Sequence, residues 1–400
     1  MPTLIFLWAV SLISQLGRHF WPRFAYVGGL PIDYLSLVVY VSELATLVLS
    51  LSLLPKLVKL LKPKPALIFL ILTAANILFA ANHWLAAYTG GKILLFALIV
   101  LIIKSFDDKQ IRTMLAGLKL ALLICFGLAL GQLVRQKSIG GVFYFLGERN
   151  FNLATPVVAK FIFAGQTWLR PYASFSHPNS LAGFIVVSLI IFNFYQKNVS
   201  AGVWWKIFGL GLLLLTGSRI ALAAAIVFLG LLLVKRQFMA HKISLCLLAL
   251  AISSSVALTL IQPDIKMGET VFQRLTLAQT MAMTASRYPL TGVGMGNSIP
   301  VTFNTSIPYQ FNLWYQPVHN VWLLLLTETG AIITAIVILC FWTLNQLLIQ
   351  KKNFSLWAGW QAVLITSLFD HYWLTLPQNR MILAVLLGIS LRSLTEKTSL

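Results

Sequence analysis

The sequence predicts an all-α fold: a polytopic integral membrane protein with about twelve transmembrane helices in one transmembrane domain, residues 1–400. Of its 400 residues, 58% are apolar and only 10% are charged, whereas roughly 25% are charged in an ordinary soluble domain. The apolar residues gather in runs suited to crossing a bilayer. No segments of alternating polarity recur, so we expect helices rather than barrel strands. A soluble enzyme is thereby excluded.

The apolar runs can be drawn in chain order. They cover about 4–16, 32–54, 66–81, 92–106, 113–134, 179–195, 203–217, 220–234, 244–261, 320–349, 354–370 and 380–393. The first run is short enough for a signal-peptide core, but it lacks a basic flank and a small-residue cleavage site, so we count it as a span. The second run holds Glu43 with no opposite charge within one helical turn, and we expect this carboxylate to pair across helices.

The chain is strongly basic, with 30 Lys and Arg residues against 10 Asp and Glu and a net charge of +20. The cations lie between the apolar runs rather than in one patch, which argues against nucleic acid as a partner. We expect membrane lipids and anionic ligands instead.

The short loops divide unevenly in charge. One side carries sixteen basic residues and is therefore expected to be cytoplasmic: Lys56, Lys59, Lys62, Lys64, Lys104, Lys109, Arg112, Lys197, Lys206, Lys235, Arg236, Lys242, Lys351, Lys352, Arg392 and Lys397. The other side carries five: Arg18, Arg23, Lys92, Arg219 and Arg380. Both chain ends are then cytoplasmic, and the long loops 135–178 and 262–318 are extracytoplasmic. We expect the active face on their side of the cell membrane.

The three cysteines fall in three different apolar runs. Neither a CxxC metal site nor a loop disulfide is therefore available to Cys125, Cys246 and Cys340. We expect them to be small core residues, and we predict no metal site and no cofactor.

Four arginines are expected on the outer face: Arg170, Arg219, Arg274 and Arg287. A guanidinium fork binds two phosphate oxygens at once, so four of them around a membrane cleft could hold a diphosphate without a metal. The alternative is that each arginine caps helix carbonyls or pairs with Asp264, Glu269 or a lipid phosphate.

His319 directly precedes an apolar run at the outer interface, where the helix dipole favours a neutral imidazole that can accept a proton. A general base is the predicted role, and the alternative is that His319 and Asn320 only cap the helix. Asp370 and His371 end another run at the same face, where they could orient a base or bind sugar hydroxyls, or form a polar turn. The glycines of 292–296 follow no strand, which favours a turn with positive φ over a phosphate loop.

Taken in order, four stretches within 170–393 resemble the O-antigen ligase and polymerase superfamily of cell-envelope glycosyltransferases. The first is Arg170 followed by His177, Pro178 and Asn179, and the second is the turn that ends at Arg219. The third is Arg274 followed by a Pro-Leu-x-Gly-x-Gly turn at 289–294. The fourth is the pair His319 and Asn320, then Gly330 after nine further residues.

The resemblance implies a membrane enzyme that transfers a glycan from undecaprenyl diphosphate to an acceptor outside the cytoplasmic membrane, without a metal. It implies that Arg170 and Arg274, helped by Arg219, hold the diphosphate and that His319 activates the acceptor hydroxyl. The helix after Arg274 lacks the Trp that many relatives carry there. Lipid A core, an elongated glycan and a protein all stay open as acceptors, because ligases, polymerases and protein-glycosylating transferases share these motifs.

Two functions of other classes also fit parts of the pattern. A transporter of a small anion such as bicarbonate would explain twelve spans and outer cations. The second function is a non-catalytic scaffold for an envelope assembly complex. A scaffold would not explain the spacing from His319 to Gly330.

Overall fold

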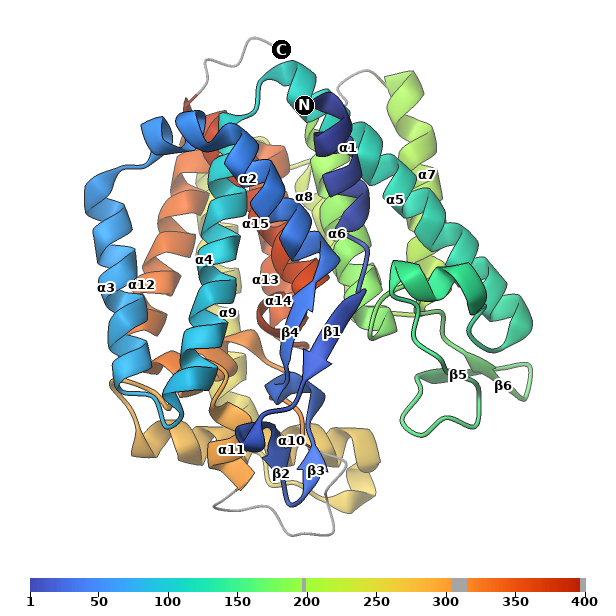
Figure 1. The fold of residues 1–400 in the computed structure, drawn as a ribbon, viewed down its shortest axis with the longest axis vertical. Coiled ribbons are helices and arrows are strands. Elements are labelled where there is room, and N and C mark those ends of the chain that lie inside the picture. Colours follow the sequence, from blue (N-terminus) through green and yellow to red (C-terminus); the bar gives the residue numbers. More distant parts are fainter. Residues whose placement is uncertain (196–198, 304–314, 396–400) are drawn as a thin grey trace.

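The structure is a computed structural model that describes residues 1–195, 199–303 and 315–395, most of them in helices (Figure 1). Lys197 and Lys397, used above for orientation, and residues 304–314 of the second long loop lie outside these ranges.

Every predicted apolar run overlaps a helix. The long helices are α1 (Pro2–Ser11), α2 (Val41–Leu60), α3 (Pro63–Leu78), α4 (His83–Ser105), α5 (Asp108–Arg135), α6 (Pro178–Tyr195), α7 (Val199–Thr216), α8 (Arg219–Leu231), α9 (Gln237–Leu260), α12 (Val321–Gln350), α13 (Phe354–Ser367) and α15 (Pro377–Thr395). Among the described residues, six helices are long and apolar enough to cross a membrane: α2, α4, α5, α6, α9 and α12. A mostly helical membrane protein follows, as predicted.

The structure also contains short strands, which the sequence did not predict. They form three antiparallel pairs: β1 (Gly17–Phe20) with β4 (Leu37–Tyr40), β2 (Tyr26–Val27) with β3 (Leu30–Pro31), and β5 (Lys160–Phe163) with β6 (Gln166–Leu169). The predicted run 32–54 is therefore α-helical only from Val41. Residues 37–40 form a strand because the β-branched pair Val38 and Val39 suits a sheet, and hydropathy does not separate an apolar strand from an apolar helix.

The second long loop also contains helices that the apolar runs did not predict, α10 (Glu269–Arg287) and α11 (Ser298–Phe303). In α10 only one face is apolar, with Leu275, Ala278, Met281 and Ala285 buried at helical spacing. A search for apolar runs misses such a helix because its other face is polar. The described residues also include short 3-10 helices and one short α-helix: η1 (Arg23–Ala25), η2 (Asp33–Leu35), η3 (Gly141–Leu146), η4 (Ile265–Met267) and α14 (Tyr372–Thr375).

The long helices lie side by side, and α1 begins at the same end of the molecule where α15 ends (Figure 1). The hairpin β2–β3 and helices α10 and α11 lie at the opposite end (Figure 1). The core between the helices is large and aromatic: Trp8, Trp357, Phe175, Phe184 and Phe192 are fully buried. Cys125 is buried in this core as predicted, but the prediction is wrong for Cys246 and Cys340, which lie on exposed helix faces.

Glu43 on α2 is paired across helices, as predicted. Its carboxylate accepts a hydrogen bond from Lys92 on α4, and Nη2 of Arg380 on α15 lies 4.0 Å from its Oε1. Lys92 also donates to the carbonyl of Val38 at 2.7 Å, which ties strand β4 to the helices. One buried carboxylate thus joins segments from both ends of the chain.

The glycine turn after α10 packs against a break in α12. Gly292, Gly294 and Gly296 all have positive φ, as predicted, and Gly330 interrupts α12 with φ 72° and ψ 177°. The break frees carbonyls of α12, and the turn uses them: Val293 N donates to Thr327 O at 2.9 Å and Gly294 N to Glu328 O at 3.0 Å. A Cβ atom at Gly330 would lie 2.2 Å from the Leu290 carbonyl oxygen, so only glycine fits there.

We expect Gly330→Ala to destabilise the protein, because this backbone conformation is nearly restricted to glycine and costs other residues about 1–3 kcal/mol before any clash. The measurement is thermal unfolding in detergent followed by circular dichroism. Gly127→Ala is the matched control: Gly127 lies in α5 with no atom near its Cβ position, so alanine should be neutral or stabilise by up to about 1 kcal/mol. Equal midpoints for the two variants would contradict the role given to the turn.

Candidate functional site

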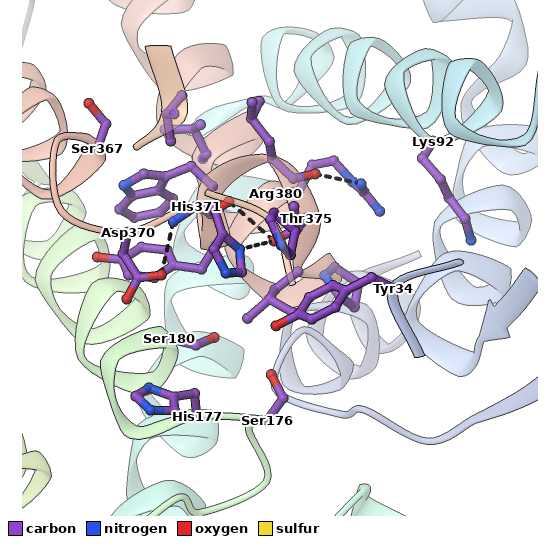
Figure 2. Close-up of a pocket in the computed structure, with 18 of the residues that line it drawn as sticks. Tyr34, Lys92, Ser176, His177, Ser180, Ser367, Asp370, His371, Thr375 and Arg380 are labelled. Carbon is purple, nitrogen blue, oxygen red and sulfur yellow. Dashed lines mark hydrogen bonds between the residues drawn. The ribbon is translucent and has the colours of Figure 1, made fainter. Parts of the chain in front are cut away.

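A cavity of about 1510 Å³ opens among α10, α12, α14, α15 and the strands β1 and β4. Its polar end is lined by titratable side chains from distant parts of the chain, including His19, Tyr34, His177, Arg274, His319, Asp370 and His371. Figure 2 shows Tyr34, His177, Asp370 and His371 around this end. This concentration of titratable groups makes the cavity the candidate site.

The centre of the polar end is a cluster of two imidazoles and a carboxylate. His319 Nδ1 lies 3.7 Å from Asp370 Oδ1, and the rings of His319 and His371 have centroids 5.0 Å apart. The ring of Tyr34 meets the His371 ring edge to face at 5.5 Å. His319, Asp370 and His371 were all predicted as site residues from the sequence. The fold brings them together by placing the start of α12 beside the chain that follows α13.

Asp370 is held by residues from the end of the first long loop and the start of α6. Asn179 Nδ2 donates to Asp370 Oδ2 at 3.1 Å, and Arg170 Nη2 donates to Asn179 Oδ1 at 2.7 Å. Arg170 Nε in turn donates to the Thr216 carbonyl at 2.9 Å. Arg170 therefore positions Asn179 and Asp370 from behind, and its guanidinium is engaged by protein oxygens.

The pKa values in the cluster are set by burial and by mutual charge. Burial alone would raise the pKa of Asp370, but the imidazoles of His319, His371 and His177 outweigh it and hold that pKa below its ordinary value. Burial lowers the pKa of His371 to about 3 and that of His177 to about 4. Asp370 is therefore ionised and His371 and His177 are neutral near pH 7.

Asn320 and His319 have different tasks at the start of α12. Asn320 caps the helix, because its Oδ1 accepts from Leu323 N at 2.9 Å, and its Nδ2 donates to Ser255 Oγ at 3.0 Å. Capping thus occupies Asn320, while His319, one residue earlier, lines the cavity. The capping alternative is correct for Asn320 and leaves the imidazole of His319 available to a ligand.

The four predicted arginines lie in different places. Arg274 lines the cavity and donates to the Phe369 carbonyl at 3.4 Å, beside Asp370. Arg170 lies behind the cluster. Arg219 and Arg287 are exposed, at the first residue of α8 and the last residue of α10, and neither is among the described residues that line the cavity. Gly330 lies at the break in α12 described above.

Sequence reasoning did not single out several residues of the cavity. Arg149 from the first long loop and Tyr34 from the turn before β4 line its polar end, and Lys92 and Arg380 line it beside Glu43. His177 belongs to the stretch from Arg170 to Asn179 that resembles the superfamily, but the sequence predicted no role for it. The sequence places Arg149 next to Glu148 in the first long loop, but nothing in the loop's pattern shows which way the side chain of Arg149 points.

Away from this cluster much of the cavity wall is apolar and follows the long helices. On α12 it includes Ile336, Cys340, Leu344 and Leu347, and on α15 Leu383, Leu387 and Leu391. The three leucines of α15 have the spacing of one helix face. The twelve residues of α12 from 336 to 347 extend roughly 16 Å. One cavity therefore joins a charged end to a long apolar wall.

Comparisons with known proteins do not show a family for this chain. No model of a known protein family matches it, and no curated protein matches it.

We expect the protein to lose stability as the pH falls from about 6.5 toward 4, because His177 stays neutral in the fold and binds a proton only when the chain unfolds. Its Nδ1 accepts from Asn179 N at 3.1 Å, and the titratable groups around it are Asp370, Arg170, His319 and Arg274. One such proton changes the free energy of unfolding by about 1.4 kcal/mol per pH unit.

Thermal unfolding in detergent between pH 4.5 and 7.5 measures this slope. His177→Gln should reduce the slope by the contribution of one proton and leave that of His371, whose pKa burial also lowers, whereas His241→Gln on α9, outside the cavity lining, should keep the wild-type slope. A wild-type midpoint that does not change with pH would refute the burial of a neutral His177.

Proposed function

We propose that the protein is an integral membrane glycosyltransferase of the O-antigen ligase type. It transfers a glycan from undecaprenyl diphosphate to an acceptor hydroxyl on the extracytoplasmic side of the cell membrane. The observation that carries the proposal is the single cavity in which a His, Asp and Arg cluster continues into an apolar wall on α12 and α15. A ligand with a polyanionic head and a long hydrocarbon chain matches both parts of this surface.

The size of the cavity favours this function over transport of a small anion. A volume of about 1510 Å³ far exceeds what a bicarbonate ion fills, and a long apolar wall would contribute nothing to binding one. A sugar attached to a lipid diphosphate needs both the volume and the apolar surface.

The side chains supply roles for a single displacement. The acceptor oxygen attacks the anomeric carbon, the bond between that carbon and the diphosphate oxygen breaks, and His319 takes the proton of the acceptor hydroxyl. Undecaprenyl diphosphate leaves, and Arg274 and Arg149 stabilise the negative charge that develops on it. Asp370 favours the imidazolium that forms on His319, 3.7 Å away, and the anomeric configuration is inverted.

The arrangement of the helices supports the orientation proposed from charge. The hairpin β2–β3 and helices α10 and α11 lie at one end, while α1 begins and α15 ends at the other (Figure 1). With the basic short loops on the cytoplasmic side, we propose twelve spans, cytoplasmic chain ends and a site that faces outward.

We expect His319→Ala and Arg274→Ala to lower transfer at least about 100-fold, since each removes a group that acts on the reacting atoms. The assay combines purified protein in detergent, an undecaprenyl-diphosphate-linked glycan, a crude envelope fraction as acceptor, and EDTA. Arg287→Ala is the control and should keep wild-type transfer, because Arg287 is exposed and lies away from the cavity lining.

The product pattern separates a ligase from a polymerase. A single shifted acceptor band indicates a ligase to lipid A core or another acceptor, and a ladder indicates a polymerase. Wild-type transfer in both His319→Ala and Arg274→Ala would refute the proposed chemistry, and anion flux into proteoliposomes that needs Arg274 would favour the transporter.

A further inference from the structure

We propose that His319, Asp370 and His371 bind a divalent transition-metal ion, and that the bound ion inhibits transfer. Each residue offers one ligand atom, and these atoms lie within 4.8 Å of one another. Two imidazoles and one carboxylate form a ligand set that zinc accepts, with water in the fourth position.

An unused nitrogen points to a missing ligand. His319 Nδ1 is buried, and it makes no hydrogen bond with any residue that the structure describes. A buried polar atom without a partner costs free energy, and coordination of a cation would remove that cost. The nearest candidate acceptor, Asp370 Oδ1, is 3.7 Å away, which is beyond hydrogen-bond length.

The other two groups are oriented as metal ligands usually are. His371 Nδ1 lies 2.7 Å from Thr375 Oγ1, so the ring is fixed and Nε2 is left for a ligand (Figure 2). Asp370 is fixed by Asn179 at one oxygen and by the backbone N–H of His371 at the other. Each carboxylate oxygen keeps a lone pair for a metal.

The spacing is close to what an ion requires. Zinc bonds of about 2.0–2.1 Å in a tetrahedron place ligand atoms roughly 3.4 Å apart. The pair His319 Nδ1 and Asp370 Oδ1 is already near that distance at 3.7 Å, and the ligand atoms of all three residues lie within 4.8 Å of one another. Because Arg274 contacts the neighbouring Phe369 carbonyl, its positive charge should make the site weaker than a structural zinc site.

The inhibitory effect rests on the proposed function. A metal bound to His319 occupies the imidazole that would otherwise take the acceptor proton, so transfer stops until the ion is removed. EDTA then leaves activity intact or raises it, and added zinc lowers it.

Binding can be measured without any activity. The full chain is purified in detergent without a histidine tag, with Cys246→Ser and Cys340→Ser to remove exposed thiols, and is titrated with Co²⁺ while its visible absorption is recorded. We expect one Co²⁺ per chain, displaced by Zn²⁺, and binding at least tenfold weaker in His371→Ala and in Asp370→Asn. His241→Ala should bind as the parent does.

Thermal unfolding of each variant shows that it is folded, and the near-isosteric Asp370→Asn provides a second variant should His371→Ala unfold. Absence of Co²⁺ binding to the parent protein would overturn the site. So would Co²⁺ binding in both variants that is as tight as in the parent. Zinc that binds there without lowering transfer would overturn the inhibition. If the site binds metal but the protein transfers no glycan, the site stands and the proposed function fails.

Discussion

Placing carboxylates inside an apolar molecule is the constraint on which the rest of the structure depends. A carboxylate taken out of water is stable only when other groups supply positive charge and hydrogen bonds. Asp370 meets this need through Asn179, which Arg170 holds in turn, and through the backbone of His371. The start of α6, the loop after β6 and the chain that follows α13 therefore take fixed relative positions. The imidazoles of the candidate site are arranged around this same carboxylate.

The sequence predicted the helices well because burial in a helical membrane protein leaves a strong trace in hydropathy. It failed where that trace is ambiguous. Leu37–Tyr40 is as apolar as a span, yet it pairs with Gly17–Phe20 as a strand. Helix α10 has one polar face, so its average composition resembles that of a loop although Leu275 and Met281 are buried. In α10 the period of the pattern, rather than its mean, carried the information, whereas the apolar run Leu37–Tyr40 has no period that separates a strand from a helix.

The candidate site was predictable in its residue types and not in its geometry. His319, Asp370 and His371 were found because titratable side chains at the ends of apolar runs are rare. Their meeting depends on how the helices pack, which no local pattern encodes. The task of Arg170 was equally hidden, since its partner, the Thr216 carbonyl, is a backbone atom. Arg149 lies in a long loop without periodicity, where a sequence gives no direction for a side chain.

The ion pair at Glu43 has a consequence for how the chain is made. A ribosome delivers α2 before α4, so Glu43 reaches the insertion machinery 49 residues ahead of Lys92. Until Lys92 arrives, the carboxylate lacks its cationic partner on α4, and an unpaired charge is costly in hydrocarbon. Helices α2, α3 and α4 are therefore expected to enter the bilayer as one unit. Arg380 joins them only near the end of synthesis, when α15 completes the wall of the cavity.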